Sequence, residues 1–480
     1  MIDSTNLRNA VTIEAIRGHQ RALQRIADRN GGTRASGTPG YGASARYIVS
    51  QIPTGAYGIT RQIFQFPFYE ALSDAELEQT APGSAPYTFD EDFTYMQYSG
   101  SAPASVSGRT VEVHLVLPPG PDPSSSTSGC EASDFAGFPA GGIALIQRGT
   151  CDFAVKAANA QAAGAAAAII FNEGQPGPTE LLAGTLGGPV VTIPVLGATF
   201  DLGNELAGIS QPVTLFVRTE TISENRRTEN VLAETRVGRP GRVVVVGAHL
   251  DSVTEGPGIN DNGSGSAAIL EIARQMANLQ VRNRVRFAWW GAEESGLLGP
   301  EYYVSQLSRA ELNRIDLNLN FDMLGSPNFV RFVYDGDGSD TPDAGPPGSA
   351  LIEQVFLQYF GFIGLATRPM AFDGRSDYGP FIAVDIPAGG LFSGAEGLKT
   401  AKEARVFGGI AGEAYDPCYH QECDTVTNVS RRGLDQLADA AAHAILTFAQ
   451  RQAPVAAVAA EARAAAVTTR SDHKGHHLVR

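Results

Sequence analysis

Histidine and carboxylate side chains recur along the second half of the chain, each close to a stretch of apolar residues. The set comprises His249, Asp251, Asp261, Glu293, Glu294, Asp322 and His420. Singly, each has an ordinary explanation, because Asp-Asn-Gly is common in turns and paired glutamates suit the start of a helix. Together, two imidazoles and several carboxylates would be costly to bury unless a cation balanced their charge. The sequence therefore predicts a metal centre.

The donor types indicate which metal such a centre binds. Imidazole and carboxylate ligands without a thiolate suit zinc, and less selectively cobalt or manganese, whereas calcium and magnesium prefer oxygen ligands. Five candidate ligands exceed what one tetrahedral catalytic zinc uses, and a bridging carboxylate can serve two ions about 3.5 to 4 Å apart. We therefore expect two zinc ions per chain. Calcium is also possible, at a place that the sequence does not indicate.

Three buried strands would bring these side chains together. Residues 243–251, 285–294 and 317–325 are rich in apolar residues, and a helical pattern covers 265–279. Continuous apolar strands joined by helices are typical of a parallel sheet with both faces covered. Ligands of such sheets bind at the carboxyl ends of the strands, where the polar side chains stand. We expect an α/β fold with a mixed, mostly parallel central sheet flanked by helices.

The composition divides the chain into three parts. Residues 1–72 and 228–452 are expected to form one discontinuous catalytic domain. Residues 73–227 are poor in lysine and rich in serine, proline, glycine and alanine, and a strand, helix and strand within 141–173 indicate a small inserted domain. The alanine-rich tail, 453–480, is expected to be disordered.

Charge and hydropathy exclude several kinds of partner. The chain has 36 Lys and Arg residues against 51 Asp and Glu residues, a net charge of −15, without a basic cluster. Nucleic acid and anionic membranes are therefore not expected as partners. No apolar run approaches the roughly 18 to 20 residues that cross a membrane as a helix.

The cysteines bear on where the protein works. Cys130 and Cys151 form one pair close in sequence and Cys418 and Cys423 another, and neither pair has the CxxC spacing of zinc or redox sites. Two disulfides and an oxidising compartment are favoured over free buried thiols. The first residues lack the pattern of a secretory signal, so the chain is either cytosolic or, as we expect, secreted with its signal removed.

The motifs around these residues resemble a known family. AHLDSV, INDNGSGSAAILEIAR, WWGAEESGLLGPEYY, NLNFDMLG, FDGRSDYGPF and CYHQECDTVTN are similar to those of the M28 zinc aminopeptidases, and most of all to the secreted bacterial leucine-type enzymes. The resemblance covers about residues 230–450. GGIALIQRGTCDFAVKAANAQAAGAAAAIIFNE resembles a protease-associated (PA) domain, which brings no catalytic group and serves access, docking or merely as a spacer.

The resemblance implies a role for each metal ligand. His249 and Asp322 would hold one zinc, Glu294 and His420 the other, and Asp261 would bridge the two. Asp251 would accept a hydrogen bond from the His249 ring and fix its tautomer, or alternatively would cap a turn.

Five further residues receive roles from the same resemblance. Glu293 would be the general base, since one carboxylate that binds no metal can accept a proton from water and pass it to the leaving amine. Tyr419 would donate to the developing oxyanion or else pack in the core. Arg375 would bind the substrate carbonyl, while Asp373 and Asp377 would order its loop.

We therefore predict a secreted, monomeric metallo-aminopeptidase that acts on peptides with a free N-terminus and prefers large apolar N-terminal residues such as leucine. Aromatic residues near 372–392 would form an apolar specificity pocket or would belong to the core; they are Phe372, Tyr378, Phe381 and Phe392. The alternatives are an M28-type carboxypeptidase, a glutaminyl cyclase-like acyltransferase with one zinc, and a binding module without activity.

Overall fold

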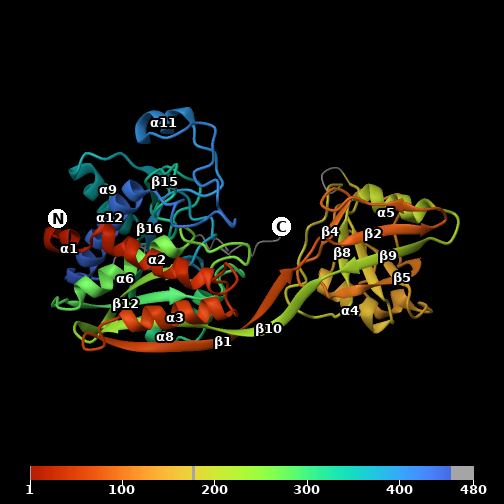
Figure 1. Cartoon of the computed structure of the whole chain (residues 1–480), viewed down its shortest axis with the longest axis horizontal. Coiled ribbons are helices and arrows are strands. Elements are labelled where there is room, and N and C mark those ends of the chain that lie inside the picture. The colour runs from red at the N-terminus through yellow and green to blue at the C-terminus, as the bar shows by residue number, and fades with distance from the viewer. Residues whose placement is uncertain (1, 176–178, 456–480) are drawn as a thin grey trace. The chain divides into compact units, whose positions relative to one another are not determined.

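The computed structural model describes residues 2–175 and 179–455, so most of the expected tail at 453–480 lies outside the described residues. The chain forms two compact units. Residues up to Phe64 and from Arg227 onward make up the first, and Gln65–Arg226 the second. Both boundaries fall inside long strands, β1 (Tyr57–Ala71) and β10 (Thr221–Thr235), by which the chain passes from one unit to the other (Figure 1).

The first unit is built around a mixed sheet. Its strand order is β1-β10-β12-β11-β13-β16-β14-β15. The six strands not yet defined are β11 (Arg239–His249), β12 (Asn283–Trp290), β13 (Ile315–Phe321), β14 (Phe332–Tyr334), β15 (Arg368–Met370) and β16 (Ala388–Phe392). The central strands β12, β11, β13 and β16 are parallel, whereas β10 and β14 pair antiparallel with β12 and β16. This arrangement confirms the expected mixed, mostly parallel α/β fold.

Helices cover both faces of this sheet because its central strands are apolar on both sides. Val244 and Val246 of β11 face one core cluster, and Val243 and Val245 face another. The helices of the first cluster are α1 (Thr5–Ala10), α2 (Ile13–Asp28), α3 (Pro39–Gln51), α6 (Gly263–Met276), α9 (Ser349–Phe362) and α12 (Arg431–Gln450). The second cluster contains residues of α7 (Leu298–Ser305) and α10 (Gly379–Ile382), with Leu312 of α8 (Arg309–Leu312) packed against it. Helix α11 (Ala401–Phe407) precedes the loop that leads to α12 (Figure 1).

Capping residues determine where helices α6 and α3 begin. Helix α6 begins at Gly263, two residues earlier than its periodicity suggested, because the Asn262 side chain accepts a hydrogen bond from the amide of Gly265. Helix α3 begins at Pro39 after the capping residue Thr38. Proline suits a first helical position, where its missing N–H is not needed.

The second unit contains a mixed sheet of its own, with strand order β3-β2-β9-β5-β6-β7-β8-β4. Its strands are β2 (Glu76–Ala81), β3 (Ala85–Pro86), β4 (Phe93–Tyr95), β5 (Ala102–Glu112), β6 (Ile143–Gln147), β7 (Ala167–Phe171), β8 (Val195–Ala198) and β9 (Thr214–Thr219). The helices α4 (Phe153–Ala162) and α5 (Phe200–Gly208) and a short 3-10 helix (Ala132–Phe135) complete it. Strand β6, helix α4 and strand β7 form the expected strand-helix-strand unit, and a disulfide joins Cys130 to Cys151. Across both units, no helix in the described part of the chain has the length and apolar character needed to cross a bilayer.

Candidate metal centre

The candidate ligands meet because three neighbouring parallel strands end at the same edge. Strand β11 ends at His249, with β12 and β13 beside it in parallel register. Glu293 and Glu294 follow the end of β12, and Asp322 follows the end of β13. Asp261 comes from the loop before α6, and His420 from the loop between α11 and α12.

Asp261 lies between the two imidazoles. Its Oδ1 is 3.2 Å from Nε2 of His249, and its Oδ2 is 3.3 Å from Nε2 of His420. Nε2 of His249 is also 3.2 Å from Oδ1 of Asp322, and Nε2 of His420 is 3.1 Å from Oε2 of Glu294. Two groups of donors share Asp261, one with His249 and Asp322 and one with Glu294 and His420. A third group joins His249 to Glu293 and Glu294.

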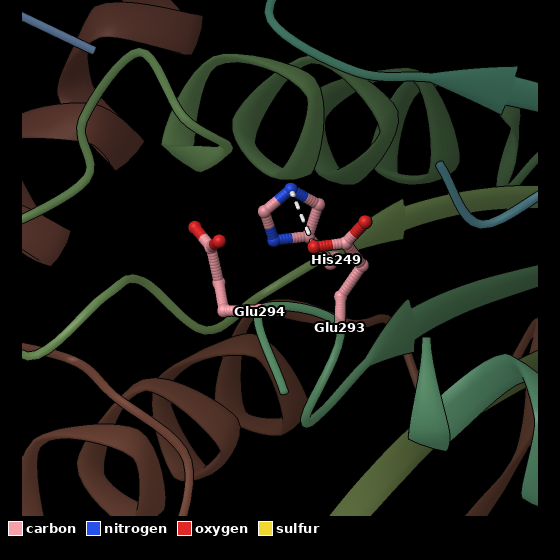
Figure 2. Close-up of side chains that lie close together, drawn as sticks. All are labelled: His249, Glu293 and Glu294. Atoms are coloured by element: carbon pink, nitrogen blue, oxygen red, sulfur yellow. Dashed lines mark ion pairs between the residues drawn. The ribbon is translucent and has the colours of Figure 1, made fainter. Parts of the chain in front are cut away.

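Glu293 and Glu294 are adjacent in the chain but approach different imidazoles. Figure 2 shows the His249 ring between the two carboxylates, with the ion pair from His249 to Glu293 as a dashed line. That contact is 3.9 Å, longer than the contacts of His249 with Asp261 and Asp322. Glu293 thus stands beside the first group, whereas Glu294 belongs to the second.

The surrounding carboxylates decide the protonation of the imidazoles. Burial by itself would lower the pKa of His249, but Glu293, Asp322 and two other carboxylates outweigh it and hold that pKa well above its usual value. His420 is in the same position, and Glu294 and Asp261 raise its pKa to about 11. Without a metal, both imidazoles therefore hold a proton at neutral pH.

The carboxylates respond to the same environment in two ways. Burial raises the pKa of Glu293 well above its usual value and that of Glu294 to about 7. Burial also acts on Asp261, but hydrogen bonds with the two imidazoles outweigh it and lower its pKa. Asp261 therefore stays negatively charged between two cations.

The donor set fits a pair of divalent cations. Among the described residues, the ion pairs of Asp261, Glu294, Asp322 and Glu293 involve imidazoles only, and no lysine or arginine forms an ion pair with them. Oε1 of Glu294 is buried and has no hydrogen-bond partner. A cluster of buried carboxylates with a free donor atom and nitrogen ligands beside it has the chemistry of a zinc site.

Residues around the ligands orient them. The hydroxyl of Ser376 donates to Oδ2 of Asp322 at 2.6 Å and accepts from the side chain of Asn320 at 2.8 Å, so the other oxygen of Asp322 faces His249. Asp251 lies behind His249, where Nδ1 of the ring is 3.2 Å from its backbone oxygen and 3.8 Å from its carboxylate. The Asp251 carboxylate accepts instead from the amide of Glu293 at 3.3 Å.

Tyr419 and Arg375 lie on the more open side of the centre. The Tyr419 ring stacks on the His420 imidazole with 3.8 Å between ring centroids, and burial raises the pKa of its hydroxyl. Arg375 is half exposed and forms an ion pair of 2.9 Å with Glu396. A disulfide joins Cys418 to Cys423 across the loop that carries Tyr419 and His420.

The aromatic residues considered for a specificity pocket lie in the core. Phe372 and Tyr378 are buried in one cluster, Phe381 is buried in another, and Phe392 packs against a third. Asp373 accepts from the amide of Arg375 and from the hydroxyl of Tyr378, as a residue that orders this loop would.

Asp377, which we also expect to order this loop, forms no side-chain hydrogen bond within the described residues. Its side chain is fully buried, and neither carboxylate oxygen has a hydrogen-bond partner. Burial and the nearby Asp322 raise its pKa well above the usual value.

Residues near the N-terminus also shape the centre, and sequence reasoning assigned them no role. The buried Arg34 guanidinium donates to the carbonyls of Leu250, Pro257 and Gly258, in the loop between His249 and Asp261. Ser36 accepts from the amide of Ala292, just before Glu293. The sequence does not reveal these two roles, because Arg34 and Ser36 stand more than 200 residues before the loops that they contact. Only the folded structure shows the contacts.

A second acidic group, away from this centre, includes Asp335, Asp337 and Glu353. The Asp335 carboxylate already accepts from the amides of Gly338 and Thr341 and from others between them. Because these hydrogen bonds already account for the Asp335 carboxylate, we assign no ion to this group, and the possible calcium ion keeps no assigned site.

The comparisons with known proteins agree with this fold. The family model for peptidase family M28 matches residues 230–445, and that for the PA domain matches residues 111–206. The chain belongs to peptidase family M28. This membership and the PA match confirm both resemblances, and with the relatives described next they confirm the expected metallo-aminopeptidase.

Two similar curated proteins are named for aminopeptidase activity. The aminopeptidase of Pseudomonas aeruginosa is 49% identical over 88% of this chain and 78% of its own length. Leucine aminopeptidase 2 of Trichophyton rubrum is 40% identical over 94% of this chain and 87% of its own length.

Solved structures with this fold carry similar names. An aminopeptidase from Aneurinibacillus sp. strain AM-1 is 27% identical, with a TM-score of 0.67 over 94% of this chain and 97% of its own. A zinc aminopeptidase from Bacillus subtilis is 25% identical, with a TM-score of 0.60 over 92% of this chain and 97% of its own.

Proposed function

We propose that the chain removes N-terminal residues from peptides with two zinc ions at this centre. The observation that carries the proposal is that Asp261 presents one oxygen to His249 and the other to His420. In this assignment His249 and Asp322 would hold one ion, Glu294 and His420 would hold the other, and Asp261 would contribute to both. The similar enzyme from Bacillus subtilis, named as a zinc aminopeptidase, supports zinc as the metal.

Glu293 is the proposed general base. Bound zinc supplies Lewis acidity, which lowers the pKa of water and polarises a carbonyl. Glu293 stands outside the two ligand groups that share Asp261, so its carboxylate can accept a proton from the attacking water. The same carboxyl group then gives that proton to the leaving amine. Asp251 keeps Glu293 in place by accepting its backbone N–H.

Tyr419 and Arg375 are proposed to bind the reacting carbonyl. Because burial raises the pKa of Tyr419, its hydroxyl keeps its proton and can donate to the oxyanion. Arg375 hydrogen-bonds the substrate carbonyl, for which part of its guanidinium must turn away from Glu396.

The acidic centre suits a substrate with a positively charged N-terminus, with Glu293 and Asp322 nearest to the ammonium group. A preference for large apolar residues such as leucine is supported by the name of the Trichophyton rubrum relative. Two disulfides support an extracellular location. A monomer is consistent with both proposed ligand groups lying in one chain.

Two substitutions and chelation test the metal assignment. Glu293→Ala should keep two zinc ions per chain but lose about 10²-fold or more of its turnover, because only the proton acceptor is gone. Asp261→Ala should lose metal as well as activity. Elemental analysis and assays before and after chelation measure both effects, and a fully active Glu293→Ala enzyme would remove this residue from the role of base.

The choice of substrate separates aminopeptidase from carboxypeptidase action. We expect hydrolysis of leucyl amide and no cleavage of an N-acylated peptide with a free C-terminal carboxylate, because the acylated terminus lacks the charge that the centre attracts. Turnover of the blocked peptide alone would reverse the assignment, and a metal content near one ion per chain would favour the acyltransferase alternative.

A further inference from the structure

Three consecutive backbone amides in the segment before α6, which carries Asp261, donate hydrogen bonds to one residue, Asp424. The backbone oxygen of Asp424 accepts from the amide of Ile259 at 3.0 Å. Its carboxylate oxygens accept separately from the next two amides, Oδ1 from Asn260 at 2.8 Å and Oδ2 from Asp261 at 2.9 Å. Three consecutive amides thus end on a single, almost fully buried residue.

Asp424 belongs to the same loop as the second imidazole. It follows Cys423 directly, and the disulfide from Cys423 to Cys418 encloses His420. On the other side of this disulfide, Asp416 accepts from the side chain of Asn260 at 2.6 Å and from the amide of Cys418 at 2.9 Å. Two residues of the loop that bears His420, Asp416 and Asp424, therefore hydrogen-bond to the segment that bears Asp261.

The chemistry of these contacts requires a carboxylate. Two adjacent amides donate to two different oxygens of Asp424, and of the common side chains only a carboxylate offers two acceptor oxygens in that geometry. Its charge is costly here, because Asp261 and Asp416 are also acidic and burial disfavours every one of them. A carboxamide of the same size would avoid this charge but would turn N–H groups toward one of the two amides.

We propose that Asp424 is a positioning residue for the bridging carboxylate. By holding the backbone of Asn260 and Asp261, it keeps the Asp261 oxygens facing His249 and His420. Through the disulfide-closed loop it also sets the distance between Asp261 and His420, two of the three ligands proposed for the second ion. The inference rests on the proposed two-metal centre and adds a residue that binds neither metal nor substrate.

The first experiment compares metal binding by the full-length wild type and two variants. Asp424→Asn keeps the size of the side chain and removes one acceptor. Glu403→Gln is the matched control, because Glu403 is also buried and accepts from a backbone amide, that of Thr400, outside the metal centre. Zinc is titrated into the metal-free proteins in competition with a chromophoric chelator.

We expect Asp424→Asn to bind zinc 10- to 100-fold more weakly at the second step, and Glu403→Gln to stay within about threefold of the wild type. The cobalt(II) form of Asp424→Asn should also show altered visible absorption bands, which a general loss of stability would not cause. Wild-type affinities and bands in Asp424→Asn would overturn the inference. A wild type that does not bind two ions would instead contradict the proposed function.

A second measurement needs no variant, in case Asp424→Asn does not fold. In the metal-free wild type, hydrogen exchange of the amides at Ile259, Asn260 and Asp261 is followed by mass spectrometry. We expect these amides to be protected at least 100-fold relative to exposed loop amides, because Asp424 holds them without metal. Exchange as fast as in an exposed loop would overturn the inference.

Discussion

Each imidazole of the centre lies among carboxylates, and this decides what must happen when metal binds. Glu293 and Asp322 act on His249, and Glu294 and Asp261 act on His420, so that both rings have raised pKa values. Zinc binds only the neutral imidazole. The protons that stabilise the metal-free centre are therefore the competitors of the metal.

Zinc binding should consequently release at least two protons per chain at pH 7, one from each imidazole and part of one from Glu294, whose pKa is about 7. A raised pKa means that the metal-free form holds these protons up to high pH, so zinc affinity should rise as the pH increases across the neutral range. Calorimetric titrations in buffers with different ionisation enthalpies measure the number released. Equal heats in all buffers would show that the imidazoles are already neutral.

The residues that carry chemistry were predictable from the sequence to different degrees. His249, Asp261 and Asp322 could be named because several imidazoles and carboxylates together imply a cation, and because their order matches a family. Ser376 and Asp424 stand inside quoted motifs, yet their contacts depend on how distant loops meet. Arg34 binds only backbone carbonyls, and no pattern of residue types marks such a partner.

At the scale of elements, the strands that end at the metal centre could be predicted from the sequence, because their residues are mostly apolar. The β-branched run of β11 and its parallel neighbours gave a correct picture of the sheet edge. The loops were harder, because their conformations follow from single contacts. Ala292, Met323 and His420 all have positive φ values, of 53°, 49° and 57°, a backbone conformation that non-glycine residues seldom adopt. The types of these three residues do not predict this backbone conformation.

The loop closed by Cys418 and Cys423 offers a prediction at this scale. Replacing both cysteines by serine should weaken zinc binding roughly tenfold, equivalent to about 1.4 kcal/mol, because ordering of the His420 loop then accompanies binding. The matched control is the Cys130 and Cys151 pair, whose replacement by serine should leave zinc affinity unchanged. Chelator competition measures both, and equal effects of the two replacements would contradict a role of the His420 loop.

At the scale of the whole molecule, the two compact units have separate cores. The large core cluster around β11 contains residues of the first unit only, and the cluster around β6 and β7 contains residues of the second. All proposed metal ligands belong to the first unit. Domains with their own cores often unfold in separate steps.

Calorimetry should therefore show two unfolding transitions, and chelation should lower only one of them. Metal that binds the folded state alone stabilises it by about 2.7 kcal/mol at one hundred times its dissociation constant, which corresponds to a shift of several degrees. Scans with and without chelator measure the shift. A single transition that moves as a whole would show that the units unfold together.

The contacts of Arg34 with Leu250, Pro257 and Gly258 have a practical consequence. A fragment cut to the span of the peptidase match, 230–445, would include every proposed ligand and still lack the guanidinium that joins three carbonyls between two of them. Such a fragment would be a poor reagent for studying the enzyme. Its inactivity would reflect a missing internal brace, contributed by the first forty residues, and would say nothing about the ligands themselves.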